Sequence, residues 1–248
     1  MAERGFKFWG WGFKDELIEE AQARQLAARF ARRFGVDGFE TTPPPKVAEI
    51  KLRASRLTPP QSLAAICSSG AEDRLIHAYG KSFPDSVKAF NRDFPNPPDV
   101  IARPRTEAEV VAVLDWADAA DAAVVPFGGG SSVVGGVEPP AKGPYKGSIT
   151  LNLQALDKVL EVDPVSRAAR IQAGVFGPAL ERQLQPHGLT LRHFPQSFQF
   201  STLGGWLATR SGGHFATLYT HIDDLTESMR VVTPAGISES RRLPVSGA

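Results

Sequence analysis

The chain has 248 residues, of which 42% are hydrophobic and 22% charged, and its formal net charge is +1. This length and apolar content suffice for one or two buried cores, as in an ordinary globular protein. The small net charge gives no reason to expect nucleic acid or an anionic membrane as a partner. Cys67 is the single cysteine, which excludes an internal disulfide and a cysteine-based metal cluster, and we expect a free, buried thiol.

An arm rich in aromatic residues and glycine lies near the start, with Gly-Phe-Lys-Phe-Trp-Gly-Trp-Gly-Phe at residues 5–13. Because aromatic side chains bury large areas, we expect the arm to pack on its own fold or on a partner subunit, with ligand stacking as the alternative. Charged residues interrupt it, so it does not resemble a secretory signal, and no stretch approaches the ~18 apolar residues of a membrane span. These features predict a cytoplasmic protein.

A helix is predicted from a cap at Asp15 to about Phe34, closed by Gly35. Acidic residues gather at its start and arginines at its end, as the helix dipole favours. An apolar stripe is expected to dock this helix on the protein, and it comprises Ala23, Leu26, Ala27, Phe30 and Phe34.

Proline-rich spacers at residues 42–45 and 58–60 predict short helices between and beyond them. Lys81 follows in the segment 74–82, and we expect it to be a solvated surface residue, with an acidic ligand group as the alternative partner. The proline-rich stretch 91–98 is the predicted domain boundary. It divides the chain into residues 1–96, the aromatic arm and a helical region, and residues 97–248.

The second domain begins with a strand, a helix, a strand and a glycine loop. Residues 97–104 predict a short edge strand, and residues 106–121 predict a helix. Thr106 and Glu109 form a capping box, and an apolar stripe follows it with Val110, Val113, Leu114 and Ala117.

The strand at residues 124–127 runs into Gly-Gly-Gly-Ser-Ser-Val-Val-Gly-Gly at 128–136. Glycines let consecutive backbone N–H groups turn toward one concavity, and Ser131 and Ser132 add hydroxyl donors, so the loop suits a phosphate. No Lys-Ser/Thr pair and no helix-forming segment follow it, which excludes the Walker and the G-x-G-x-x-G patterns. A glycine-rich surface turn is the alternative.

Further strands and a helix follow the loop. Residues 148–153 alternate as a half-buried strand, and residues 159–162 and 168–173 predict two more. Pro178 opens a helix that ends at His187-Gly188, and residues 189–191 predict a short strand. Another strand begins at Val231.

A second motif occupies residues 194–213, Phe-Pro-Gln-Ser-Phe-Gln-Phe-Ser-Thr-Leu-Gly-Gly-Trp-Leu-Ala-Thr-Arg-Ser-Gly-Gly, with Ile-Asp-Asp-Leu at 222–225 and Val-Val-Thr-Pro-Ala-Gly at 231–236. Together with the glycine loop, these motifs resemble the alkylglycerone-phosphate synthase-like group of the vanillyl-alcohol oxidase and p-cresol methylhydroxylase (PCMH-type) family. The resemblance implies an α+β fold. A helical N-terminal region precedes a two-lobed PCMH-type FAD-binding domain, with a small parallel β/α lobe and a mostly antiparallel sheet lobe.

The resemblance implies non-covalent FAD, whose diphosphate and flat ring system need backbone donors and an apolar slot. The diphosphate is expected at Pro126, Phe127, Gly128, Gly129, Gly130, Ser131 and Ser132. The ribityl chain and ring are expected at Gln196, Ser197, Phe198, Gln199, Phe200, Ser201 and Thr202, and the wall is completed by Thr209, Arg210, Ser211 and Gly212. Gln196 stands where the family often has Asp, and a helix cap with a packing turn is the alternative for residues 201–205.

Histidines offer two alternatives to this assignment. His214 ends an Arg-Ser-Gly-Gly-His string that resembles the covalent flavin attachment of berberine-bridge-type oxidases, but here the string follows the second motif, which favours non-covalent binding. His187, His193 and His221 have no carboxylate or histidine at ligand spacing, so we expect no metal. The pair Asp223-Asp224 is expected to cap or bond the backbone rather than act in acid–base catalysis.

The resemblance implies alkyl-for-acyl exchange on acyl-dihydroxyacetone phosphate in ether lipid synthesis, with flavin N5 as a covalent handle and no net oxidation. One alternative is an FAD-linked oxidase or dehydrogenase of a small 2-hydroxy acid, and another is a non-catalytic flavin-binding remnant or interaction module. The partners implied are FAD and a small-molecule or lipid substrate, without nucleic acid, and a homodimer is an assembly that the resemblance allows.

The family's third flavin loop and its substrate-binding cap, which carries the catalytic residues, do not occur in this sequence. We therefore expect the chain to be an N-terminal half, inactive alone, with its catalytic residues unknown and beyond residue 248. Surfaces that the other half covers are expected to be open and to promote self-association.

Overall fold

The computed structural model describes residues 5–218 and 221–240. The helices are α1 (Glu20–Phe34), α2 (Ala71–Ile76), α3 (Phe83–Phe90), α4 (Glu107–Ala119), α5 (Gly177–Leu184) and α6 (Leu203–Ala208), with the 3-10 turns η2 (Val47–Glu49), η3 (Gln61–Ile66), η4 (Gln185–His187) and η5 (Asp223–Leu225). The strands are β1 (Cys67–Ser68), β2 (Val100–Ala102), β3 (Ala122–Phe127), β4 (Gly147–Asn152), β5 (Val159–Asp163), β6 (Ala168–Ile171), β7 (Arg230–Thr233) and β8 (Gly236–Glu239). None of the described helices is long and apolar enough to cross a membrane.

The largest sheet has the strand order β1-β2-β4-β3, in which β2, β4 and β3 are parallel and β1 is antiparallel. The prediction that β2 lies at the edge is wrong, because β1, which the sequence did not reveal, pairs outside it. The prediction that β4 is half-buried is also wrong. All six of its residues are buried because it lies between two parallel strands with both faces covered.

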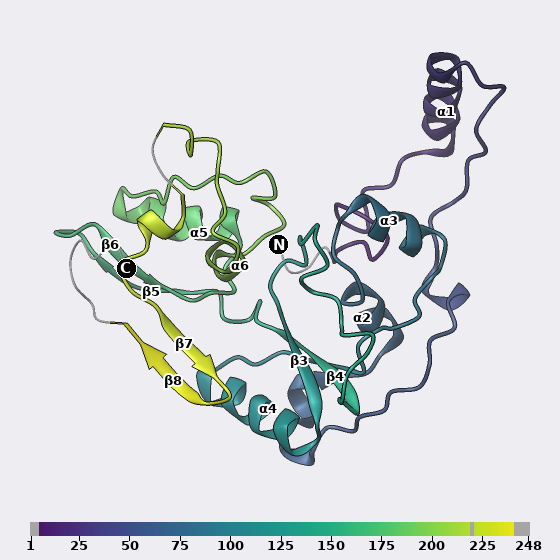
Figure 1. The fold of residues 1–248 in the computed structure, drawn as a ribbon. Coiled ribbons are helices and arrows are strands. Elements are labelled where there is room, and N and C mark those ends of the chain that lie inside the picture. Colours follow the sequence, from purple (N-terminus) through teal and green to yellow (C-terminus); the bar gives the residue numbers. More distant parts are fainter. Residues whose placement is uncertain (1–4, 219–220, 241–248) are drawn as a thin grey trace.

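Helix α4 packs on this sheet as its sequence predicts (Figure 1). The Thr106 hydroxyl accepts a hydrogen bond from the N–H of Glu109 at 3.2 Å, while the Glu109 carboxylate reaches the N–H of Arg105 rather than that of Thr106. Val110, Val113 and Ala117 are buried, and Leu114 is half-buried. The predicted apolar stripe therefore forms the helix side of the first core.

The second lobe combines the antiparallel hairpin β5–β6 with α5 and α6 (Figure 1). Its core consists of Val175, Leu180, Leu184, Leu203, Trp206 and Ile222. A second antiparallel hairpin, β7–β8, lies beside α4, where Arg230 pairs with Glu107 at 2.7 Å. The predicted parallel and antiparallel parts are thus confirmed, with the antiparallel part as two separate hairpins. Residues 189–191 form no strand, contrary to the prediction.

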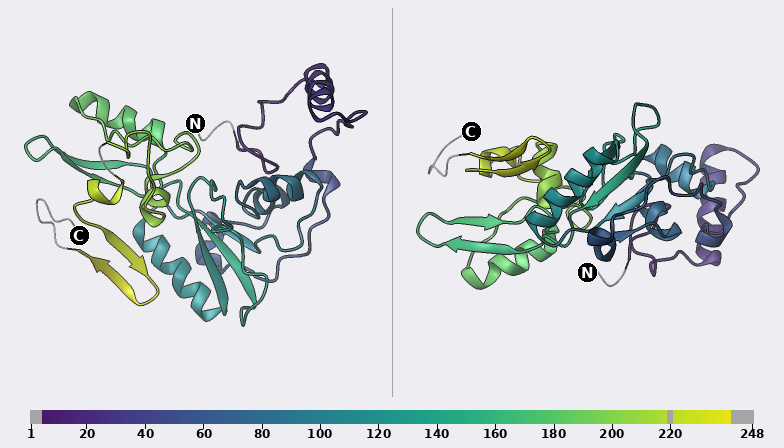
Figure 2. Two further views of the ribbon diagram at one scale, coloured as in Figure 1. Left: turned by 45° about the horizontal axis from the view of Figure 1, so that its top comes forward. Right: turned by 90° about the horizontal axis from the view of Figure 1, so that it is seen from below.

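Helix α1 stands away from the rest of the protein (Figure 1 and the left panel of Figure 2). It begins after Glu19 rather than Asp15, and it ends at Gly35 as predicted. The prediction that its apolar stripe docks is wrong: Leu26, Phe30 and Phe34 are 40%, 48% and 67% exposed, and only Ala31 of the helix is buried. Within the described residues, the ring of Phe39 packs edge-on against Phe34, with centroids 6.4 Å apart, and the stripe does not join any of the three buried cores.

The aromatic arm packs on its own fold, as one of its predicted alternatives states. Phe8 is 3% exposed and joins a core with Leu75, Tyr79 and Phe94. This core includes α2 and α3, so the N-terminal region folds as a layer of short helices beside the main sheet.

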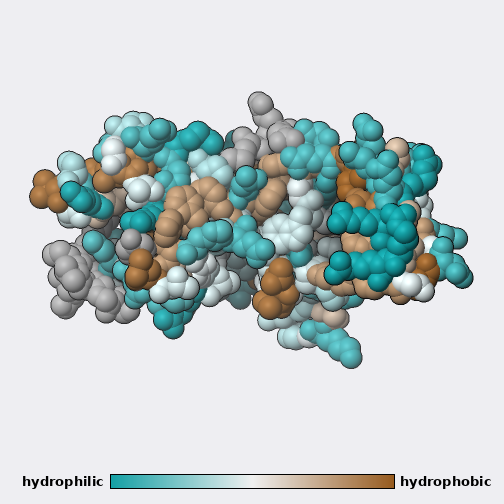
Figure 3. Space-filling model, turned by 90° about the horizontal axis from the view of Figure 1, so that it is seen from above, coloured by the Kyte–Doolittle hydropathy of each residue, from teal (hydrophilic) through white to brown (hydrophobic). Residues whose placement is uncertain are grey.

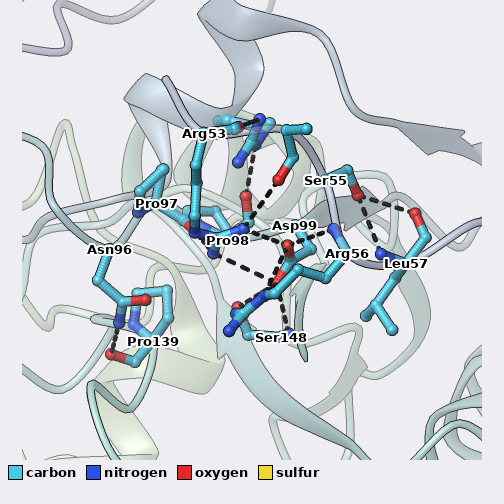
Figure 4. Close-up of polar contacts among 12 residues, drawn as sticks. Arg53, Ser55, Arg56, Leu57, Asn96, Pro97, Pro98, Asp99, Pro139 and Ser148 are labelled. Carbon is cyan, nitrogen blue, oxygen red and sulfur yellow. Dashed lines mark hydrogen bonds and ion pairs between the residues drawn. The ribbon is translucent and has the colours of Figure 1, made fainter. Parts of the chain in front are cut away.

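Asp99 ties this N-terminal region to the sheet (Figure 4). Its carboxylate is fully buried, pairs with Arg53 and Arg56, and accepts a hydrogen bond from the N–H of Ser148 at 2.9 Å. Burial alone would raise the pKa of this carboxyl, but hydrogen bonds from Arg56 and Arg53 hold it well below its usual range. The ion pairs therefore join the segment 53–56, the start of β2 and the start of β4.

Cys67 lies in β1 and is half-buried rather than fully buried. Desolvation raises the pKa of its thiol to about 11. The thiol is therefore protonated near neutral pH and is a weak nucleophile.

Candidate functional site

The glycine loop leaves the carboxyl end of β3, the edge of a parallel sheet where ligands commonly bind. Within residues 5–218 and 221–240, no group accepts a hydrogen bond from the N–H of Gly129, Gly130 or Ser131. Gly130 has φ +68°, a conformation that favours glycine. Several adjacent backbone donors are thus without a partner among the described residues, and the anion that the sequence predicts here stays a prediction.

The second motif lies directly against this loop. A Cβ on Gly128 would overlap the Thr202 hydroxyl, and a Cβ on Gly129 would overlap the carbonyl oxygen of Phe200. The structure therefore brings residues 126–132 and 196–202 together, although about 70 residues separate them in the sequence. Glycine at positions 128 and 129 is therefore required by this close packing.

The second motif begins as a turn and continues as α6. Ser201 is buried, donates to the carbonyl of Ser197 at 2.8 Å, and accepts from the indole N–H of Trp206 at 2.6 Å. Thr202 precedes the first residue of α6, but its hydroxyl makes no helix-capping bond and faces Gly128 instead. The packing turn of the alternative is thus observed, its side-chain helix cap is not, and the cofactor role of these residues stays a prediction.

Other predicted residues differ in exposure. Pro126, Gln196 and Gln199 are exposed, Phe127 is buried, and Phe198 and Phe200 are half-buried. The Phe198 ring packs on Trp206, and the Phe200 ring packs on the aromatic arm.

A buried polar chain that the sequence did not reveal supports the loop from behind. His77 is 2% exposed, and its Nδ1 donates to the carbonyl of Asp73 at 2.7 Å while its Nε2 accepts from the Asn152 amide at 2.8 Å. Asn152 in turn accepts from the N–H of Gln154, whose amide donates to the carbonyl of Gly128 at 2.6 Å. The His77 ring also packs on Phe127, with ring centroids 4.3 Å apart.

Lys81 is not the solvated residue that the sequence predicts. It is half-buried, its N–H donates to the carbonyl of Ser132 at 2.7 Å, and its Nζ donates to the carbonyl of Lys7 at 2.9 Å. Burial lowers the pKa of its ammonium group to about 8. Nothing in its local sequence indicated this burial, because the residues that cover it come from the arm and the loop.

Residues 209–212 lie at the opposite end of α6 from Thr202, and the polar contacts of their side chains are made with residues outside the glycine loop. Arg210 pairs with Asp223 at 2.6 Å, the Thr209 hydroxyl donates to the carbonyl of Gly205 at 3.0 Å, and the Ser211 hydroxyl bonds His193 at 2.8 Å. Their part in a cofactor wall stays a prediction.

The histidines and carboxylates near this region make local contacts. His193 is buried against Trp206, and desolvation lowers its pKa. The N–H of His214 donates to the carbonyl of Phe194, while its side chain is exposed. Asp224 accepts a backbone bond from His221 at 3.3 Å, as predicted. No group of three potential metal ligands occurs among the described residues.

Known proteins resemble both the sequence and the fold. A family described as FAD binding domain matches residues 98–239. An alkyldihydroxyacetonephosphate synthase of Dictyostelium discoideum is 41% identical to this chain, over 71% of this chain and 28% of its own length. Alkyldihydroxyacetonephosphate synthase is another name for alkylglycerone-phosphate synthase. A solved alkyldihydroxyacetonephosphate synthase has a TM-score of 0.84 and 30% identity over 96% of this chain and 49% of its own. An uncharacterized FAD-linked oxidoreductase of Escherichia coli K12 is 33% identical over 63% of this chain and 31% of its own length.

Proposed function

Because this chain belongs to the FAD-binding domain family and its cofactor is FAD, we propose that it is the flavin-binding half of an alkylglycerone-phosphate synthase. The reaction is the exchange of an acyl for an alkyl group on acyl-dihydroxyacetone phosphate. The chain spans less than half the length of the synthases it matches, so the reaction belongs to the whole enzyme. FAD, when bound, supplies the electrophilic chemistry of the exchange.

The observation that carries this proposal is the joining of the glycine loop and the second motif. The free N–H groups of Gly129, Gly130 and Ser131 fit a diphosphate, and the half-buried aromatic side chains of the second motif are of the apolar kind that the rest of the cofactor needs. In this proposal residues 126–132 bind the diphosphate, residues 196–202 line the ribityl chain and ring, and residues 209–212 complete the wall. His214 stays unattached.

The oxidase alternative is the more distant one. The FAD-linked oxidoreductase matches a smaller share of this chain than the synthases do, whereas the solved synthase also covers the arm and the N-terminal helices. A non-catalytic flavin-binding remnant predicts the same cofactor site, and we place it after the synthase because the named relatives with the highest identity are synthases.

Three further predictions stay part of the proposal. The domain boundary at 96/97 is supported by a family match that begins at residue 98. The cytoplasmic location and the homodimer rest on the sequence alone.

The test is the visible absorption spectrum of the purified chain, before and after incubation with FAD and desalting. We expect retained yellow colour that is released as FAD on denaturation. Gly129→Ala should abolish retention, because its Cβ would overlap Phe200. Gly38→Ala, outside the loop, is the control, since its Cβ would meet nothing within 4 Å.

Colour that stays with the polypeptide after denaturation would instead assign His214 as a covalent attachment site. A wild-type chain that retains no FAD would contradict the proposed site. Turnover of a 2-hydroxy acid by the whole enzyme, without alkyl exchange, would favour the oxidase.

A further inference from the structure

The aromatic arm contacts the proposed flavin site from a third side. An antiparallel bridge between Phe6 and Phe13 and a hydrogen bond from the N–H of Lys7 to the carbonyl of Gly12, at 3.1 Å, fold the arm into a small hairpin. Three of its rings surround that of Phe200, with centroid distances of 6.0 Å for Phe6, 5.8 Å for Trp11 and 5.5 Å for Phe13. Phe200 is the residue whose carbonyl lies against Gly129.

A second contact connects the arm to the other end of the loop through Lys81. The indole N–H of Trp11 donates to the carbonyl of Lys81 at 3.0 Å, and Nζ of Lys81 donates to the carbonyl of Lys7 at 2.9 Å. The N–H of Lys81 then donates to the carbonyl of Ser132 at 2.7 Å. A Cβ on the preceding Gly80 would overlap that same Ser132 oxygen, so the backbone of residues 80–81 is in direct contact with the backbone of the loop.

We propose that the arm, residues 6–13, is a third element of the flavin site, which fixes the glycine loop in its FAD-binding conformation through Phe200 at one end and Lys81 at the other. The inference rests on the proposed function. Trp11 and Phe6 are positioning residues in this arrangement: they touch Lys81, Phe176 and Phe200, and these touch Gly129 and Ser132. A loop held in advance binds its ligand more tightly, because less conformational entropy is lost on binding.

The test compares two tryptophans of the same arm in the full chain. Trp11→Phe keeps a ring against Phe200 but removes the indole donor to Lys81. Trp9→Phe is the matched control, because Trp9 packs on Phe8, in the core on the other side of the arm. We expect Trp11→Phe to raise the FAD dissociation constant about 3–10-fold, the effect of one lost neutral hydrogen bond, and Trp9→Phe to change it less than 2-fold.

A second readout does not need FAD. Amide hydrogen exchange at Lys81 reports its bond to Ser132, and we expect it to accelerate in Trp11→Phe but not in Trp9→Phe. Phe6→Leu, which removes a ring from the Phe200 cluster, should weaken FAD binding as well.

The outcomes separate the two ideas. If the wild-type chain binds FAD and all three variants bind it equally well, the arm inference is wrong and the flavin site stands. If the wild type binds no FAD, the proposed function fails, and the inference falls with it. A drop in affinity for Trp11→Phe that matches that for Trp9→Phe, with equal losses of melting temperature, would assign the arm a merely structural role and overturn the inference.

Discussion

At the level of single residues, Asp99 combines full burial with two arginine partners. Arg53 and Arg56 approach it from one chain segment, and the N–H of Ser148 approaches it from β4. Removing one partner of a buried ion pair leaves an uncompensated charge, which costs more than the pair itself contributes.

Asp99→Asn is therefore expected to lower the free energy of unfolding by about 3–5 kcal/mol. Urea unfolding followed by circular dichroism measures this loss. Asp115→Asn, on the exposed side of α4, is the control and should change stability by less than about 0.5 kcal/mol. A loss below about 1 kcal/mol for Asp99→Asn would contradict the role assigned to the cluster.

Because His77 is buried, the free energy of unfolding is expected to decrease as the pH falls. Burial lowers its pKa from 6.5 to about 4. Between these values the unfolded chain binds the proton and the folded chain does not, so stability falls as the pH falls from about 6.5 toward 4. The contribution reaches about 3 kcal/mol at pH 4.

His77→Gln should remove this component, so that the difference in unfolding free energy between wild type and variant shrinks as the pH falls. Urea titrations at pH 7, 6, 5 and 4 measure it, with the exposed His187→Gln as the control. Parallel pH profiles for wild type and His77→Gln would show that His77 is not the group responsible.

At the level of elements, α1 and α4 show what an apolar stripe does and does not predict. Both have one, yet α4 buries its stripe on the sheet while that of α1 is exposed. Periodicity reports that a face is apolar, and it does not report which surface covers that face.

Replacing Leu26, Phe30 and Phe34 of α1 together by Gln should therefore change the free energy of unfolding by less than about 1 kcal/mol, since these side chains are exposed and join none of the three buried cores. Leu180→Ala in α5, where the side chain is 1% exposed, is the comparison and should cost about 2–5 kcal/mol. Thermal or urea unfolding of the three proteins measures both. A large loss in the α1 variant would mean that the helix docks in solution.

At the level of the whole molecule, exposed apolar side chains form separate patches between hydrophilic ones on the face seen in Figure 3, rather than one continuous area. The stripe of α1 is the largest aligned set on a single helix. Such surfaces promote association when nothing covers them.

We accordingly expect the isolated chain to self-associate with rising concentration, and the triple Gln variant of α1 to do so less. Sedimentation velocity over a concentration series checks this. A wild-type chain that stays monomeric throughout would contradict the prediction.

Much of the fold and part of the site could be predicted from local patterns. The capped helix α4, the strand-to-loop transition after Phe127 and the motif at 194–213 each carry their information in adjacent residues. The burial of Lys81, the chain from His77 to Gly128 and the pairing of β1 with β2 depend on residues far apart in sequence, which local patterns do not report. The exposure of Leu26 was missed for the same reason, because docking is a property of two surfaces.

The loop that begins at Gly128 touches Lys81 on one side and Thr202 on the other. During synthesis Lys81 therefore leaves the ribosome well before the loop, and Thr202 leaves it well after. Bringing such distant segments together is slow relative to local helix formation. During synthesis the glycine loop is complete while the segment that packs against it has yet to be made. The proposed cofactor site is therefore complete only after the chain has been extended past Thr202, so FAD binding at this site has to follow the synthesis of the second motif.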